Sequence, residues 1–352
     1  QNGFLYVPAE GRSLLFVKQS VTRARAESAL ADILAIDSVK AIPGRIADAG
    51  GRPANRLAME LDVLPVNEFR FYRDLYRPRE AVDGSPLVLR VRSIKSEWEI
   101  AQLEATAEIG RRTFDYMRTV MAPGLTEMQF AGMYEAYART IGHGGKLRVR
   151  HYNTEVYHWH VLSGASGGRV GVLDSPASGE GTSAAFPAGA GYRRLRADEP
   201  VMVDLGTIIN GYHMDETRMF AIGSMPEKAR RACRAAIDIH DAVIERARPG
   251  TTLAELFDLA TSMAARMGFE DAFLGPPGRQ VSFIGHGIGI EIVEPPIIAR
   301  GRKTPLEAGM VFALEPKLVY RNEFAAGIES VFRVTANGGR LVSKVPVEIF
   351  IC

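Results

Sequence analysis

Four acidic residues lie within or directly after apolar, strand-like runs of this sequence. Asp204 and Asp215 belong to the run 201–218, and Glu315 and Glu329 belong to later runs. A carboxylate is expensive to bury unless it is protonated, paired or bound to a metal ion. These acids are therefore the first candidates for chemistry in the chain.

The first two acids are predicted to face the same side of a β-hairpin. Asn210-Gly211 separates two β-type runs, and Asn-Gly is the strongest short-range signal for a two-residue turn. That turn sets Asp204 opposite Thr217 and diagonal to Asp215. Because side chains alternate between the faces of a strand, His213 joins them on one face. The hairpin alone leaves open whether these carboxylates bind a cation or whether Asp204 simply ends a strand.

Each of the other acids also has an explanation that requires no chemistry. Asp215 could pair with Arg218. Glu315 could pair with Lys317, and Glu329 could lie at the rim of a sheet. Together, however, four carboxylates need more positive charge than one arginine and one lysine supply, so bound cations are the simpler explanation.

A histidine with small or apolar neighbours lies between these runs. His286 stands in Gly285–Gly289, where glycines let the backbone approach another group closely, although a satisfied loop histidine is the plainer interpretation. Carboxylates and an imidazole without a thiolate suit Mn²⁺, Co²⁺, Fe²⁺ or Zn²⁺. Carboxylates shared by two ions hold them about 3.5–4 Å apart, as in two-metal hydrolases. We therefore expect two divalent ions, with Mn²⁺ the first choice.

Composition narrows the class of protein. The chain has 352 residues, and at roughly 150 residues per domain this length predicts two domains. A net charge of +2 excludes a general polyanion binder, so no nucleic acid is expected as a partner. Two cysteines exclude a disulfide framework, and no apolar stretch reaches the roughly 18 residues of a membrane span. We expect a cytoplasmic protein that does not bind membranes.

The first ninety residues predict a small α/β unit without catalytic signals. Its expected elements are a hairpin and two helices, over residues 4–17, 23–34 and 66–76. The polar, turn-rich segment 77–86 is the predicted linker. The predicted domains are residues 1–88 and residues 89–352.

The larger part of the chain contains a repeated pattern of two helices joined by Pro-Gly. Helices are expected over about 96–121, 126–142, 227–247 and 252–268, and the matched positions are Pro123 and Pro249, Gly124 and Gly250, Thr126 and Thr252, Gln129 and Glu255, and Gly142 and Gly268. Capping boxes at Ser96, Thr126 and Thr252 mark three helix starts. Pro-Gly is also common punctuation between helices, but five matches without a gap favour a duplicated unit on a sheet core.

The motifs around the acids resemble the pita-bread metallopeptidases, a family that includes methionine aminopeptidase, Xaa-Pro aminopeptidase, prolidase and creatinase. The resemblance rests on these segments: Arg92–Ile100, Asp204–Gly206, Asp215–Arg218, Gly285–Gly289, Glu315-Pro316 and Ile328-Glu329. It covers residues 90–352, and the first unit resembles the N-terminal domain of the Xaa-Pro branch. The resemblance implies an α+β, pita-bread catalytic domain with an internal pseudo-two-fold duplication, preceded by a small α/β domain.

The resemblance also implies roles for the candidate residues. Asp215 would bind one metal and His286 the other, while Asp204, Glu315 and Glu329 would touch or bridge both. A bridging hydroxide would be the nucleophile, and Glu315 would carry its proton to the leaving nitrogen. Thr217 would lie just outside the ligands, on the substrate side.

The sequence departs from the family on that substrate side. Two positions where the family's peptidases carry histidine hold Pro187 and Val293. Gly327 stands where the Xaa-Pro branch often has arginine, and Lys317 stands where a glycine usually follows Glu-Pro. Loss of one donor to the tetrahedral intermediate is typically worth about 10²–10³-fold in rate.

Other histidines are candidates to replace the lost ones. His213 is predicted on the metal face and is taken as a catalytic candidate. His158 and His160 share a face if their run is a strand, although a solvated strand is the plainer interpretation, and His160 is the candidate for substrate binding with Thr217.

These observations predict a two-metal aminopeptidase or dipeptidase acting on short peptides, with proline after the scissile bond. The alternatives are a hydrolase of another C–N or ester bond on the same scaffold, and a metal-binding homologue without turnover. A homodimer is expected from analogy with the family alone.

Overall fold

The computed structural model describes residues 3–52, 54–150, 160–171 and 175–352. The chain divides after Val88 into two compact units, each with its own core. Within the described residues, no helix is both long and apolar enough to cross a membrane.

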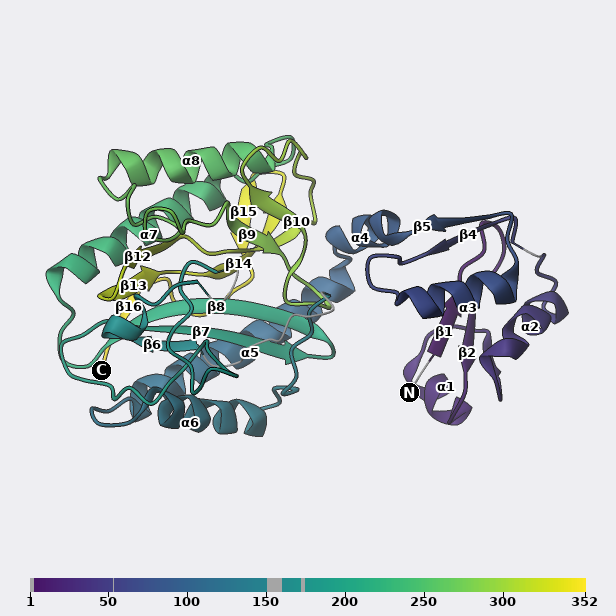
Figure 1. Ribbon diagram of the computed structural model, residues 1–352, viewed down its shortest axis with the longest axis horizontal. Helices are drawn as coiled ribbons and strands as arrows, with labels where there is room; N and C mark the ends of the chain where they lie inside the picture. The colour runs from purple at the N-terminus through teal and green to yellow at the C-terminus, as the bar shows by residue number, and fades with distance from the viewer. Residues whose placement is uncertain (1–2, 53, 151–159, 172–174) are drawn as a thin grey trace. The chain divides into compact units, whose positions relative to one another are not determined.

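The first unit is a small α/β structure around a three-stranded sheet (Figure 1). Its elements are β1 (Gly3–Tyr6), β2 (Leu14–Val17), α1 (Val21–Glu27), β3 (Ile33–Ala35), a 3₁₀ turn (Val39–Ala41), α2 (Ile42–Asp48), β4 (Arg56–Met59), α3 (Val66–Tyr76), β5 (Glu80–Asp83) and α4 (Ser85–Ser93), which continues into the second unit. The expected hairpin is confirmed by the antiparallel pairing of β1 with β2. Helix α3 spans the residues predicted for it.

Two expectations for the first unit are wrong in detail. The helix expected over 23–34 ends at Glu27, because Ser28 is extended and Ile33–Ala35 instead pairs with β2 as a buried strand. The segment 77–86 is not a free linker, since β5 pairs with β4 and the Asp83 carboxylate caps the start of α4 through Ser85. Tertiary pairing overrides the local signal in both places.

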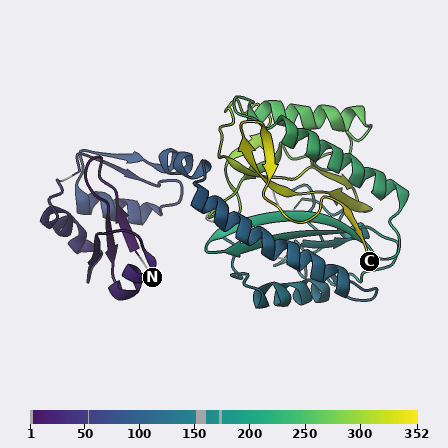
Figure 2. The ribbon, with the colours of Figure 1, turned by 180° about the vertical axis from the view of Figure 1, so that it is seen from behind.

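The second unit places two pairs of helices on opposite sides of its strands (Figures 1 and 2). Its helices are α5 (Glu97–Val120), α6 (Glu127–Thr140), α7 (Glu227–Arg246) and α8 (Leu253–Arg266), with a 3₁₀ turn at Gly164–Ser166. Its strands are β6 (His160–Ser163), β7 (Val201–Ile209), β8 (Tyr212–Ala221), β9 (Phe283–Gly287), β10 (Glu294–Ala299), β11 (Val311–Leu314), β12 (Lys317–Tyr320), β13 (Phe324–Gly327), β14 (Ser330–Thr335), β15 (Gly338–Leu341) and β16 (Ile349–Ile351). Helices α5 and α6 pack on β6–β8, and α7 and α8 pack on strands of the later half.

The two helix pairs enter the core in the same way. Gly124 donates its backbone N–H to Leu195 at 2.9 Å, and the matched Gly250 donates to Leu306 at 3.0 Å. Both glycines have positive φ, 91° and 90°, which the turn requires. The capping boxes at α5, α6 and α8 are all present. This repeated geometry supports the internal duplication expected from the sequence.

The strands form three groups in the second unit. A four-stranded sheet has the order β16-β8-β7-β6, a five-stranded sheet has the order β10-β9-β11-β14-β15, and β12 pairs with β13. Asn210 and Gly211 turn the β7–β8 hairpin with φ of 49° and 85°, as a two-residue turn of this type requires. The register pairs Asp204 with Thr217, as expected.

Candidate metal centre

Glu315 and Glu329 lie where two strands pass from one sheet into another. Strand β11 ends at Leu314 and β12 begins at Lys317, while β13 ends at Gly327 and β14 begins at Ser330. Because β11 pairs with β14 and β12 pairs with β13, the two glutamates occupy the facing gaps between these ladders. The break in the ladder turns both carboxylates inward.

Three further side chains reach the same region from other strands. The hairpin supplies Asp204 from β7 and Asp215 from β8, and β9 supplies His286. Glu329 is tied to the hairpin by reciprocal backbone hydrogen bonds with Thr217, at 3.1 and 3.3 Å. The five residues singled out in the sequence therefore converge, although they are far apart along the chain.

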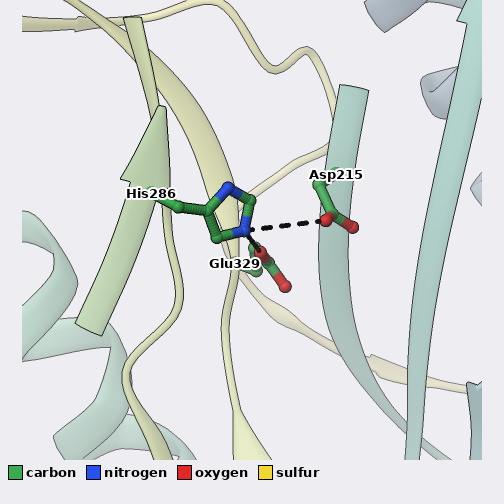
Figure 3. Close-up of side chains that lie close together, drawn as sticks. All are labelled: Asp215, His286 and Glu329. Carbon is green, nitrogen blue, oxygen red and sulfur yellow. Dashed lines mark ion pairs between the residues drawn. The ribbon is translucent and has the colours of Figure 1, made fainter. Parts of the chain in front are cut away.

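His286 faces several carboxylate oxygens, and Figure 3 shows those of Asp215 and Glu329 beside its ring. Its Nε2 lies 3.9 Å from Asp215 Oδ2, 3.7 Å from Glu315 Oε1 and 4.0 Å from Glu329 Oε1. Its Nδ1 is 3.0 Å from the Gly287 carbonyl. A carbonyl can only accept, so Nδ1 donates to Gly287, and Nε2 is the ring atom that faces the carboxylates and could bind a cation.

Three of these four donor side chains can share one divalent ion, and Glu315 falls outside that group. The separations are too long for direct hydrogen bonds. Two ligands each about 2.1 Å from a shared ion are separated by at most about 4.2 Å, and the measured distances fall within that limit. Asp215, His286 and Glu329 also group together as a possible metal site. Asp215 and His286 therefore belong to one candidate group, whereas the resemblance assigns them to two ions.

Lys317 lies on the other side of the carboxylates. Its Nζ is 2.8 Å from Glu315 Oε2, 3.0 Å from Asp204 Oδ2 and 3.2 Å from Glu329 Oε2. Its side chain is only 2% exposed. The pairing of Glu315 with Lys317, which the sequence left open, is therefore present, and Lys317 also contacts two of the other acids.

The electrostatics of the centre reflect burial and crowding of like charges. Burial, with the neighbouring charges of Glu329 and Asp204, raises the pKa of the Asp215 carboxyl well above its ordinary value. Burial likewise raises the pKa of Glu329 to about 8, although Lys317 opposes the shift. Burial also disfavours the charged form of Asp204, but Lys317, His160 and Asp215 together outweigh it, and the pKa of Asp204 lies below its ordinary value. An additional cation near Asp215 and Glu329 would favour their charged forms.

Thr217 and Arg218 hold the glutamate junction in place. The Thr217 hydroxyl donates to Glu329 Oε2 at 2.9 Å. The Arg218 guanidinium is fully buried and donates to the carbonyls of Thr217, Glu329, Val345 and Pro346. Arg218 therefore does not pair with Asp215, and the buried Thr217 hydroxyl is bonded to Glu329.

The two candidate histidines differ in their surroundings. His160 is the cross-strand partner of Asp204, so its side chain shares a face with the centre, and burial lowers the pKa of its imidazole. In His213, Nδ1 is 2.9 Å from the Gly289 carbonyl, and Nε2 accepts from the Arg148 N–H at 3.0 Å. Both ring nitrogens of His213 thus bond backbone groups. His158 lies outside the described residues.

Sequence reasoning found the five converging residues but missed the uses of two others. Lys317 was noted as a departure from the family and as a possible partner of Glu315, but its contacts with Asp204 and Glu329 depend on the β12–β13 pairing. Arg218 was considered only as a possible ion-pair partner of Asp215, yet strand alternation puts it on the opposite face. Side-chain alternation along the strand was the signal in the sequence that could have shown that Arg218 faces away from Asp215.

Family models match both units. Metallopeptidase family M24 matches residues 101–336, and the creatinase/prolidase N-terminal domain matches residues 1–94. An Xaa-Pro dipeptidase of Pyrococcus furiosus is 32% identical over 170 residues, 48% of this chain and 47% of that protein. An uncharacterized peptidase of Bacillus subtilis is 26% identical over 297 residues, 84% of this chain and 75% of that protein. The chain thus spans about half the length of the Pyrococcus relative.

Solved structures share the fold. An X-Pro aminopeptidase from Thermotoga maritima has a TM-score of 0.81 at 20% identity, and the match covers 97% of this chain and 88% of the Thermotoga chain. An Xaa-Pro dipeptidase from Bacillus anthracis has a TM-score of 0.81 at 22% identity, and the match covers 100% of this chain and 90% of the Bacillus chain. The pita-bread fold with a preceding α/β domain, expected from the sequence, is confirmed.

Proposed function

The chain belongs to metallopeptidase family M24, and from that premise we propose that it cleaves short peptides before proline at a metal held by Asp215, His286 and Glu329, with Glu315 beside it. The observation that carries the proposal is the ring of three carboxylate oxygens within 4.0 Å of His286 Nε2. The Xaa-Pro preference is supported by the named activity of the Pyrococcus relative and by the creatinase/prolidase N-terminal domain.

Glu315 is the proposed proton carrier. When bound, the metal ion supplies Lewis-acid chemistry, polarising the scissile carbonyl and acidifying water. Lys317 holds Glu315 Oε2, so Oε1, on the side of His286, is the atom that takes a proton from the attacking water. The same oxygen then returns the proton to the leaving nitrogen.

His160 is the proposed donor to the substrate carbonyl. It stands opposite Asp204, and its lowered pKa leaves a neutral imidazole, which carries one N–H, near neutral pH. Thr217 is proposed as a positioning residue, because its hydroxyl is already bonded to Glu329. The role predicted for His213 stays untested, and its two backbone hydrogen bonds give it no spare donor.

A peptide screen tests this function. Protein reconstituted with Mn²⁺, Co²⁺, Fe²⁺ or Zn²⁺ is incubated with Xaa-Pro dipeptides and tripeptides, with Xaa-Ala peptides as controls, and the products are identified by mass spectrometry. We expect cleavage before proline, with Mn²⁺ the preferred ion. Metal-loaded protein that cleaves none of the peptides would overturn the proposal.

A Glu315→Gln variant tests the proton carrier. General acid–base catalysis contributes about 10²–10⁴-fold, so kcat should fall by that factor while metal binding is largely kept. An unchanged kcat would refute the role.

The replacement of two family histidines by Pro187 and Val293 favours a second candidate function. Val293 is 40% exposed and offers no hydrogen-bond donor from its side chain. A screen of non-peptide amides and esters under the same conditions tests whether the protein hydrolyses another C–N bond or an ester bond. The expected homodimer and cytoplasmic location stay predictions. Light scattering would test the first, and cell fractionation would test the second.

A further inference from the structure

The metal centre has two cation positions, and the chain's own lysine lies on one of them. Each glutamate divides its two oxygens between these positions. Oε1 of Glu315 and of Glu329 faces His286 Nε2, whereas Oε2 of each accepts from Lys317 Nζ. Asp204 bonds Lys317 as well, and Asp215 lies on the side of His286.

We propose that the Lys317 ammonium permanently takes the place of one of two metal ions, so that the centre binds a single divalent ion. This inference rests on the metal centre of the proposed function, but it concerns the number of ions and not the substrate. It replaces the expectation of two ions drawn from the sequence.

A glycine across the strand pair makes room for the lysine. Lys317 and Gly327 are cross-strand partners in β12 and β13. A Cβ atom at position 327 would lie 2.6 Å from Lys317 Cγ and 3.3 Å from Lys317 Cβ. Since 2.6 Å is closer than non-bonded carbons approach, any other residue at 327 would force the lysine stem to move. Lys317 and Gly327, two departures from the family pattern, are thus coupled, because the lysine side chain occupies the space that a larger residue at 327 would need.

Lys317 has little freedom to leave when metal arrives. Its side chain is 2% exposed, and three carboxylates from separate segments hold the ammonium within 3.2 Å. Removing an ammonium from such partners would leave buried, unpaired charges, which is strongly destabilising. A second divalent ion sharing the same oxygens would stand beside the ammonium, where water does not screen the repulsion. One ion on the His286 side avoids this conflict.

The test is the number of ions bound. Metal-free protein is titrated with Mn²⁺ by calorimetry, and the bound metal is measured after gel filtration. We expect one equivalent for the natural chain and two for Lys317→Ala. Lys95→Ala, which removes another buried lysine of the same unit, is the matched control and should stay at one equivalent.

Electron paramagnetic resonance gives a readout independent of activity. An isolated Mn²⁺ ion gives a six-line spectrum, whereas two ions about 3.5–4 Å apart couple and lose it. We expect the six-line spectrum in the natural chain and a coupled spectrum in Lys317→Ala. If the variant does not fold, the natural chain alone decides between one ion and two.

Several results would overturn the inference. Two equivalents or none in the natural chain would do so, and so would a folded Lys317→Ala variant that still binds one. The outcome is separable from the proposed function: one bound ion without peptide cleavage refutes the function and leaves the inference, and cleavage with two bound ions does the reverse.

Discussion

Two clusters of buried charges in the second unit compensate the free-energy cost of burying charge in different ways. In the metal-centre cluster, Asp204, Asp215, Glu315 and Glu329 meet Lys317 and His286 through the ion pairs of the described residues. In the second cluster, which we call the Glu294 cluster, Glu291 and Glu294 meet Arg92, Lys95 and Arg150. The first has a surplus of acids and the second does not.

The pKa values of the acids follow this balance. Burial opposes the charged form of Glu294, but Lys95 and Arg92 outweigh it, and the pKa of Glu294 lies below its ordinary value. In the metal-centre cluster, burial raises the pKa of Glu329 to about 8 despite Lys317. A buried acid by itself therefore does not indicate a metal site. A group of acids that outnumbers its cationic partners does.

Removing the histidine ligand should have the largest effect. Loss of hydrogen bonds behind a metal ligand typically costs about 10–100-fold in affinity, so His286→Ala, which removes the ligand itself, should weaken Mn²⁺ binding by more than about 100-fold and abolish hydrolysis. Calorimetry and a peptide assay measure both. Retained binding near the natural affinity would mean that the ring around Nε2 is not the metal site.

A matched change in the Glu294 cluster should damage stability and not metal binding. Glu294→Gln removes the carboxylate that pairs with the buried Lys95 and leaves Arg92 with Glu291 alone, and breaking a buried pair costs about 3–5 kcal/mol. Urea denaturation should show that loss, while the folded variant keeps its Mn²⁺ equivalents. A lost equivalent would show that the two clusters are one functional unit.

Removing a hydrogen bond to a proposed metal ligand should weaken metal binding less than removing the ligand itself. Thr217→Val keeps the shape of the side chain but removes the hydroxyl that donates to Glu329. Outer hydrogen bonds of this kind are worth about 10–100-fold in metal affinity. Titration with Mn²⁺ checks the shift, and Thr217→Ser, which keeps a hydroxyl, should recover most of it.

The smallest expected effect is a pH dependence of stability that comes from the Glu294 cluster. Because the pKa of Glu294 is lowered by folding, the native state binds fewer protons there than the unfolded state, and stability rises with pH in that range. The stability difference between the natural chain and Glu294→Gln should be full above about pH 4.5 and shrink as pH falls below it. Denaturation curves at several pH values measure it. A constant difference would contradict the assignment.

The convergence of the candidate metal-centre residues was predictable because their local signals are strong. An acid in an apolar strand, a glycine-flanked histidine and an Asn-Gly turn can each be identified without long-range information. Strand alternation then places Asp204, Asp215 and Thr217 on one face. The repeated Pro-Gly helix pairs were recognised in the same way, since a duplicated unit repeats its turn residues.

Other features depend on contacts that no local pattern contains. Glu294 begins an apolar strand and Glu315 directly follows one, yet the neutralising partners of Glu294, Arg92 and Lys95, lie about two hundred residues earlier. The helix expected over 23–34 failed because Ile33–Ala35 gains a strand partner that its own sequence does not reveal.

The sequence by itself determined which side chains can carry charge into the core and which strand faces they share, because side-chain alternation and turn chemistry are local. The tertiary structure decided how those charges are balanced. It brought Lys317 to three acids over Gly327 and brought Arg92 and Lys95 to Glu294. The physical reason is that electrostatic free energy depends on distances of a few ångströms between groups, and those distances exist only after the strands have paired.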